Sequence, residues 1–84
     1  MQINRDQELV HWRRIFRIVI AASRIDANLS QQKIADLLQV TRNTVANLET
    51  GRRVIEAAEV PLIAKALDCN PEMLFRRVLM WRRP

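Results

Sequence analysis

Apolar residues recur three and four positions apart along most of this chain, and that spacing places them on one face of an α-helix. The first such pattern begins at Asp6 and stops before Asn28. Its inward positions are Leu9, Trp12, Phe16, Val19 or Ile20, and Ser23. We therefore predict one long amphipathic helix that closes at Asn28, since asparagine tolerates the left-handed backbone of a helix end.

Two shorter helical patterns follow between residues 29 and 51, with only a few residues between them. Ser30 and Thr41 are suited to cap these helices, and Gly51 is suited to the left-handed end of the second. The small side chain of Ala35 allows the second helix to cross close over the first. The remaining inward positions are Ile34, Leu37, Leu38, Val45 and Leu48. This arrangement predicts a helix-turn-helix.

Two more helices are predicted in the C-terminal part. A fourth extends from about Glu59 to Leu67, with Pro61 in the first turn, where proline is tolerated. Asn70 is suited to cap a last helix over residues 71–82. Nearly half of the residues are apolar and there is one glycine. We therefore predict an all-α fold of five helices without a sheet, in a single domain over residues 1–84.

The second helix of the predicted helix-turn-helix has a face that nothing requires to be buried. Its members are Arg42, Asn43, Ala46, Asn47 and Thr50, which share one side by the helical period. Arginine and asparagine pair bidentately with guanine and adenine edges in the major groove, and small residues approach the thymine methyl. We interpret this face as a surface that reads DNA sequence.

Three stretches carry a resemblance to a known family: QQKIADLLQVTRNTVANLETG, the RR that follows it, and LIAKALDCNPEMLF further on. Over residues 16–75 the chain resembles the lambda-repressor-like (XRE-type) helix-turn-helix domains of the Cro and phage-repressor class. The resemblance implies a five-helix DNA-binding domain whose partner is double-stranded DNA. It further implies a sequence-specific transcriptional regulator, most often a homodimeric repressor of a near-palindromic operator.

The resemblance also assigns roles to individual positions. Bases would be read by Arg42, Asn43, Asn47 and Ala46. Phosphate or methyl contacts would come from Gln31, Thr41, Thr44, Thr50, Arg52 and Arg53. A structural ion pair would join Arg24 to Glu49, fixing how the reading helix sits.

Two departures from the family pattern affect these expectations. Gln39 stands at a turn position where glycine is usual, so we expect a strained left-handed residue there. The connection after Arg53 lacks the usual proline and carries Val54 and Ile55 instead. These two side chains are either buried under the fourth helix or exposed for a partner.

The last helix carries more apolar residues than one small domain requires. We predict that its stripe of Leu74, Val78 and Trp81 forms a homodimer interface. The alternative is that Trp81 folds back on Trp12 or Phe16 within the protomer. The residues before Phe16 provide a second candidate interface.

The formal charge of +5 favours a polyanionic partner, and arginines cluster at 13, 14 and 17 and at 52 and 53. The single cysteine, Cys69, and the single histidine, His11, allow neither a zinc site nor a nucleophile–base pair. We therefore expect no enzyme activity, no metal or other cofactor, and no small-molecule substrate.

The chain also lacks an apolar run long enough for a bilayer and the charge order of a secretory signal. We expect no membrane partner and a cytoplasmic, nucleoid-associated protein of bacterial or phage origin. Two alternatives to a phage-type repressor stay open. One is an autoregulating antitoxin or a restriction–modification control protein of the same fold; the other is a protein-interaction module without DNA binding.

Overall fold

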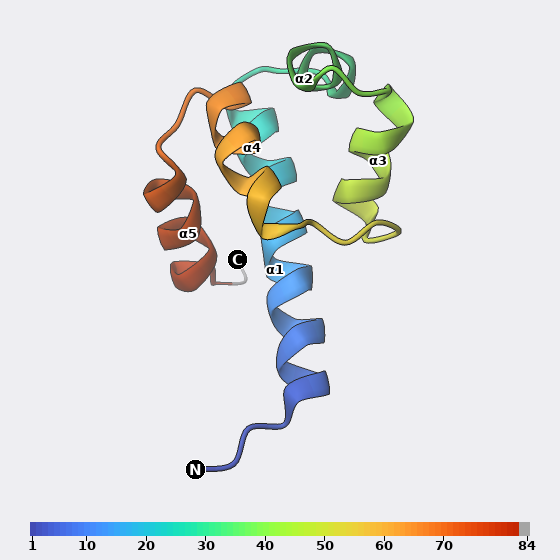
Figure 1. Ribbon diagram of the computed structural model, residues 1–84. Helices are drawn as coiled ribbons and strands as arrows, with labels where there is room; N and C mark the ends of the chain where they lie inside the picture. The colour runs from blue at the N-terminus through green and yellow to red at the C-terminus, as the bar shows by residue number, and fades with distance from the viewer. Residues whose placement is uncertain (83–84) are drawn as a thin grey trace.

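The computed structural model describes residues 1–82, and within them the chain forms five α-helices, one short 3-10 helix and no strand (Figure 1). The elements are α1 (Arg5–Asp26), α2 (Gln31–Leu38), α3 (Arg42–Thr50), η1 (Ala57–Glu59), α4 (Val60–Ala66) and α5 (Pro71–Met80). The predicted all-α class with five helices is confirmed. Residues 83 and 84 lie outside the described part of the chain.

The helix starts follow the capping residues in the sequence. Ser30, Thr41 and Asn70 each accept a hydrogen bond from a backbone N–H in the first turn of the helix they precede, as predicted. The first helix begins slightly earlier than the predicted Asp6, because the side chain of Asn4 provides a cap that the apolar pattern alone does not indicate.

Four helix ends adopt left-handed backbone geometry. Asn28 (φ 62°), Gln39 (φ 58°) and Gly51 (φ 85°) were expected from the sequence, whereas Asp68 (φ 55°) was not. At Gly51 the positive φ favours glycine, and a Cβ atom there would also require the guanidinium of Arg17 to move.

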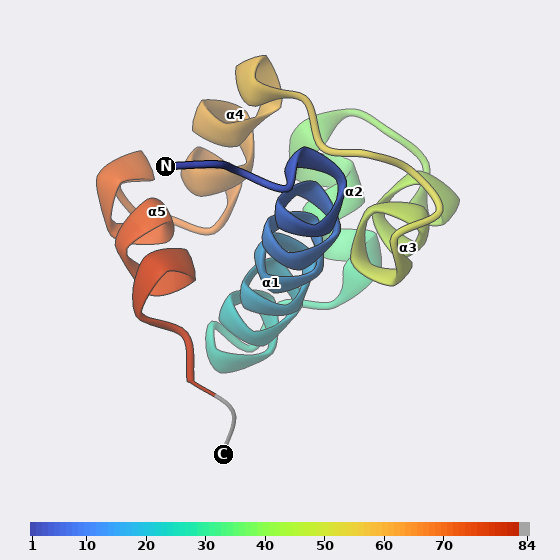
Figure 2. The same cartoon turned by 90° about the horizontal axis from the view of Figure 1, so that it is seen from below.

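The core lies among the five helices, and each of them contributes at least one buried side chain. Its buried side chains are Val19, Ile20, Ile34, Ala35, Val45, Val60, Ile63, Ala64, Leu67, Leu74 and Val78. Seen from below, α1 runs between α5 on one side and the α2–α3 pair on the other (Figure 2). Over its C-terminal half, α1 therefore packs against α5 on one side and against α3 on the other.

This packing corrects the predicted dimer stripe. Leu74 is 0% exposed and Val78 2%, so both are core residues of the protomer. Trp81 is half-buried and packs against the same core. The prediction that these three side chains form an interface is wrong for Leu74 and Val78, because α5 turns this stripe toward α1. The large hydrophobic side chains that α5 exposes are Met73, Phe75, Leu79 and Met80.

Two specific contacts fix α5 on α1. The rings of Phe16 and Phe75 meet edge to face, with centroids 5.2 Å apart. Nη1 of Arg77 donates a 3.0 Å hydrogen bond to the hydroxyl of Ser23, which is buried. These contacts orient α5 and satisfy a polar group in the core.

The N-terminal turns of α1 project beyond the rest of the molecule (Figure 1). With these turns included, the described chain measures 43 × 25 × 22 Å. Val10 and Trp12 on this part are exposed. The indole N–H of Trp12 donates to Glu8 of the same helix at 3.1 Å. Over residues 1–82, no helix is both long enough and apolar enough to cross a membrane.

We expect Leu74→Ala to lower the free energy of unfolding by about 2–5 kcal/mol, because it leaves a cavity in the core. Leu79→Ala on the same helix is the matched control, since Leu79 is 62% exposed; its effect should stay within about 0.5 kcal/mol. Denaturant unfolding followed by circular dichroism measures both. Equal effects would contradict the burial of the Leu74 stripe.

Candidate nucleic-acid interface

The α2–α3 pair has the close crossing of a helix-turn-helix. Ala35 is completely buried at the crossing, together with Val45 and Leu48 of α3. The turn ends α2 with two backbone hydrogen bonds, from the N–H of Val40 to the carbonyl of Ala35 (3.0 Å) and from the N–H of Gln39 to that of Asp36 (3.3 Å). This pair of bonds is a Schellman motif, which holds Gln39 in the left-handed region without glycine.

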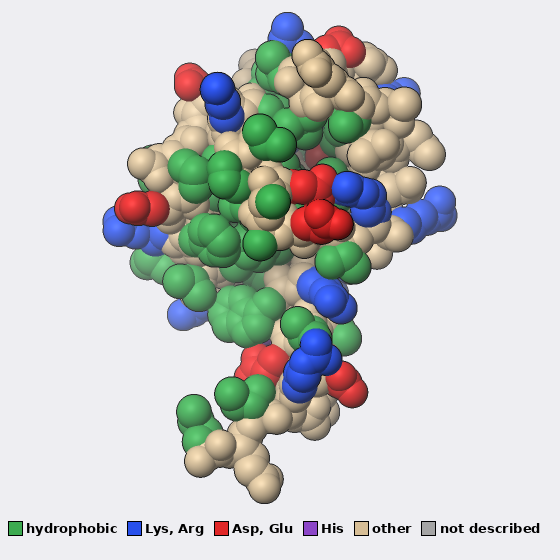
Figure 3. Space-filling view, viewed as in Figure 1, with side chains coloured by type: hydrophobic (Ala, Val, Ile, Leu, Met, Phe, Trp, Pro, Cys, Tyr) green, Lys and Arg blue, Asp and Glu red, His purple; other side chains and the backbone are tan. Residues whose placement is uncertain are grey.

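The predicted reading face of α3 points to solvent. Arg42, Asn43 and Thr50 are exposed, and Ala46 and Asn47 are half-buried. Within residues 1–82 no protein hydrogen bond engages the side chains of Arg42, Asn43 or Asn47. The surface over α3 in Figure 3 is mainly polar, whereas hydrophobic side chains gather over α4, α5 and α1. These donors and acceptors are therefore available to a ligand.

The threonines of this region have local partners. The hydroxyls of Thr41 and Thr44 lie 3.0 Å apart, and Thr41 also caps α3. The hydroxyl of Thr50 donates to the carbonyl of Ala46 at 2.9 Å. All three are at the surface of α3 or its start, so their oxygens can still accept or share a hydrogen bond.

A partly buried ion pair joins α1 to α3. Arg24 donates from Nε to Glu49 Oε2 at 2.7 Å and from Nη2 to Oε1 at 3.0 Å, and a third bond runs from Nη1 to the carbonyl of Leu29 at 2.8 Å. The hydrogen bond to Glu49 raises the pKa of Arg24 more than burial lowers it. The pair expected from the sequence is thus present as a charged, bidentate contact, with side chains 14% and 7% exposed.

Gln31 belongs to the same cluster. Its Nε2 donates to Glu49 Oε1 at 3.0 Å, so α1, α2 and α3 meet at one carboxylate. The family resemblance assigns Gln31 to a phosphate contact, and that assignment stays a prediction. In the structure one N–H of its amide is used internally, which leaves the second N–H and the backbone N–H groups at the start of α2 for an anion.

The two arginines after α3 differ in their surroundings. Arg52 is exposed and forms no ion pair within residues 1–82, whereas Nη2 of Arg53 lies 2.8 Å from Glu59 Oε2. Arg53 therefore has a structural partner in Glu59, and its assignment to a phosphate contact stays a prediction. The backbone N–H of Glu56 also donates to Glu59 (3.0 Å), as part of a capping box around η1.

Glu59 is the structural residue that sequence reasoning missed. Burial raises the pKa of its carboxyl, but the hydrogen bonds from Arg53 and from the backbone of Glu56 outweigh burial, and the pKa falls below its ordinary value of 4.5. The Glu56-x-x-Glu59 spacing was the available signal, since it matches a capping box. Within the described residues no cluster of His, Cys, Asp and Glu is arranged to hold a metal ion.

Comparisons with known proteins agree with this geometry. The helix-turn-helix family (HTH_3) matches residues 20–74. Among solved structures, the crystal structure of the clp gene regulator ClgR from C. glutamicum is similar in fold, with a TM-score of 0.76 over 86% of this chain and 96% of that chain, at 16% sequence identity. No curated protein sequence matches the chain significantly.

The chain belongs to the lambda-repressor-like (XRE-type) helix-turn-helix family, because the family match covers most of its length and includes α2 and α3 entirely. This confirms the predicted family. It places the chain among DNA-binding transcriptional regulators.

We expect Glu49→Leu to destabilise the protein by about 3–5 kcal/mol, since it leaves the charge of Arg24 without a partner in a partly buried site. The double variant Arg24→Met/Glu49→Leu should recover most of that loss, because no charge is then stranded. Denaturant unfolding of the three proteins gives the comparison. A double variant no more stable than Glu49→Leu would show that the pair itself supplies the stability.

The Arg53–Glu59 pair should make stability depend on pH. Because the folded pKa of Glu59 is lowered, its contribution is complete above pH 4.5 and is lost as the pH falls through the folded pKa. Glu59→Gln keeps an acceptor for Glu56 but removes the charge. The difference in unfolding free energy between wild type and Glu59→Gln should therefore shrink toward zero on acidification from pH 7 to 3, and Arg53→Gln should show the same trend. Parallel curves over this range would contradict the assignment.

Proposed function

We propose that this protein is a homodimeric repressor that binds a near-palindromic operator in double-stranded DNA through α3. The observation that carries the proposal is the face of α3 where Arg42, Asn43 and Asn47 reach the surface with side chains that form no hydrogen bond to other residues of the described part of the chain. A helix held on a close-packed α2 and anchored by the Arg24–Glu49 pair can enter the major groove as a rigid unit.

Base recognition would come from this face. The guanidinium of Arg42, at the N-terminal end of α3, suits the O6 and N7 acceptors of guanine. The amides of Asn43 and Asn47 suit adenine, and the methyl of Ala46 suits a thymine methyl. The half-burial of Asn47 and Ala46 gives them a fixed position, so they discriminate with little loss of side-chain entropy.

Phosphate contacts would flank the reading face on both sides. The start of α2 offers backbone N–H groups and the free amide N–H of Gln31, and the hydroxyls of Thr41, Thr44 and Thr50 border α3. Arg52 supplies an unpaired cation just after α3. With a net charge of +5, each protomer would release counterions from DNA on binding.

A two-fold dimer would place two α3 helices one duplex turn apart, which fits two half-sites about 34–36 Å apart. Dimerisation also doubles the number of phosphate contacts, so each protomer needs fewer of its own.

The experiment separates base reading from phosphate binding. A site is first selected from a random duplex pool, and affinities are then measured by fluorescence anisotropy across a salt series. Arg42→Ala should lose about 1–3 kcal/mol of discrimination at one base pair per half-site, with guanine preferred by the wild type. Arg52→Ala should weaken all duplexes equally and reduce the slope of log K against log salt by about 0.9 per arginine removed.

Arg76→Ala is the matched control, since it removes the same charge from an exposed position on α5, across the molecule from α3 (Figure 1). It should leave base preference unchanged and alter the salt slope less than Arg52→Ala. A wild-type protein without steep salt dependence would instead identify a protein-interaction module, and an Arg42→Ala variant with unchanged base preference would refute the reading role of Arg42.

A further inference from the structure

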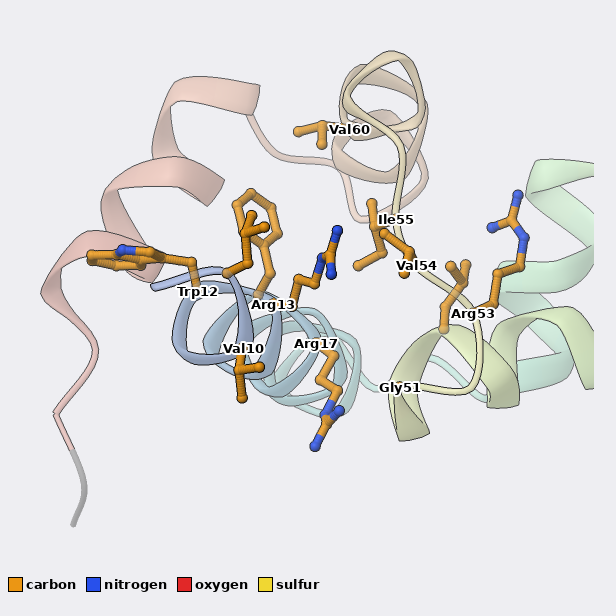
Figure 4. Close-up of a pocket in the computed structure, with 12 residues that line it drawn as sticks. Val10, Trp12, Arg13, Arg17, Gly51, Arg53, Val54, Ile55 and Val60 are labelled. Carbon is orange, nitrogen blue, oxygen red and sulfur yellow. The ribbon is translucent and has the colours of Figure 1, made fainter. Parts of the chain in front are cut away.

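A groove of about 490 Å³ lies between the N-terminal half of α1 and the connection from α3 to η1 (Figure 4). We call it the α1 groove. Its apolar lining includes Val10 and Phe16 of α1, Val54 and Ile55 of the connection, and Leu48 of α3. Val10 and Val54 are 67% and 52% exposed, so each wall of the groove carries an apolar side chain at the surface.

The wall made by α1 includes exposed residues near the start of the helix, among them Val10. The family match begins at residue 20, so the first fifteen residues of the α1 helix, 5–19, precede the matched region. The first turns among them project from the body, with hydrophobic side chains interspersed among charged ones (Figure 3). Exposed apolar side chains that face each other across a groove, with charged residues around them, are typical of a protein–protein interface.

Two copies of this helix have complementary charges when they lie antiparallel, because the acidic end of one then faces the basic residues of the other. With 100° per residue, Asp6, Val10, Arg13 and Arg17 lie within an arc of about 60° on the side that faces the groove. The carboxylate of Asp6 has only a loose contact, 3.8 Å from Arg5, and its side chain is 94% exposed. Within residues 1–82 neither Arg13 nor Arg17 forms an ion pair. Acid at one end and bases at the other therefore stand unpaired on one face.

We propose that the α1 groove binds the N-terminal half of α1 from a second copy of this chain, antiparallel across a two-fold axis at Val10. Asp6 lies about 6 Å before Val10 along the helix axis and Arg13 about 4.5 Å after it. Asp6 of one copy thus comes level with the partner's Arg13, and the symmetry repeats this contact on the other side of the axis. The two Val10 side chains meet at the centre and cover the groove walls at Val54.

This occupant accounts for two features of the connection. Val54, in place of the proline usual in the family, becomes an interface residue, while Ile55 is already half-buried in the protomer. The groove also adjoins Gly51 at the end of α3, where Arg17 lies against the turn (Figure 4). A seam here links the dimer axis directly to the C-terminal end of the reading helix. The inference rests on the proposed function, since it names the interface of the dimer proposed there.

The first test measures oligomeric state without DNA, by sedimentation equilibrium over a range of protein concentrations. Val10→Asp should raise the dimer dissociation constant at least tenfold, because it places two carboxylates at the axis. Leu79→Asp is the matched control: Leu79 is also an exposed apolar residue on a helix, 62% exposed on α5. It should leave the dissociation constant unchanged. Circular dichroism verifies that both variants keep their helices.

The second test exchanges the charges. Asp6→Arg and Arg13→Asp should each raise the dissociation constant, roughly threefold or more since two exposed pairs are lost per dimer. The double variant should return it toward the wild-type value, as the pairs re-form with opposite sign. Restoration by the double variant requires direct contact between these positions, because independent surface effects would add.

Each other outcome overturns the inference. A wild type that is monomeric at all concentrations, or a dimer broken by Leu79→Asp and unaffected by Val10→Asp, excludes the α1 groove as the seam. The same applies if the charge exchange fails to restore dimerisation. Because these measurements contain no DNA, their failure differs from failure of the proposed function: a monomer that still binds its selected site retains DNA recognition by α3 and loses only the interface.

Discussion

The arrangement of the helices depends on the hydrogen bonds that the carboxylate of Glu49 accepts. This carboxylate lies near the end of α3 and receives hydrogen bonds from Arg24 of α1 and Gln31 of α2, so three helices converge on one anionic group. A helix of nine residues is too short to be stable by itself in water. Its orientation must be imposed by its neighbours, and a bidentate ion pair defines that orientation more narrowly than apolar packing does.

A second glutamate acts in a similar way just beyond α3. Glu59 holds Arg53 and caps η1, which fixes the path of the connection after the reading helix. The chain therefore uses the same side chain, arginine, for two purposes. Arg24 and Arg53 are neutralised by glutamates and serve the structure, while Arg42 and Arg52 beside the α3 face form no ion pair with the rest of residues 1–82. The polar surface near α3 is cationic because glutamates neutralise only two of the arginines in this region, Arg24 and Arg53, within residues 1–82.

The apolar side chains divide in a corresponding manner. The stripe of α5 that contains Leu74 and Val78 closes the core against α1, and the exposed hydrophobic residues of α5, Phe75 and Leu79 among them, lie outside that stripe. The N-terminal half of α1 is different, since Val10 borders a groove with further apolar walls and unpaired charges lie beside it. The exposed Val10 lies on the part of α1 that precedes the family match.

The sequence by itself determined the features that depend on neighbours a few residues apart. These include the five helices, the caps at Ser30, Thr41 and Asn70, the left-handed residues Asn28, Gln39 and Gly51, and the helix-turn-helix with its outward Arg42 and Asn43. Local hydrogen bonds and helical periodicity decide all of them. Only the tertiary structure decided that Gln31 binds Glu49, that Glu59 takes Arg53, and that α5 turns Leu74 inward. For each of these groups the sequence offers several chemically equivalent partners or faces, and the choice among them depends on how the helices pack.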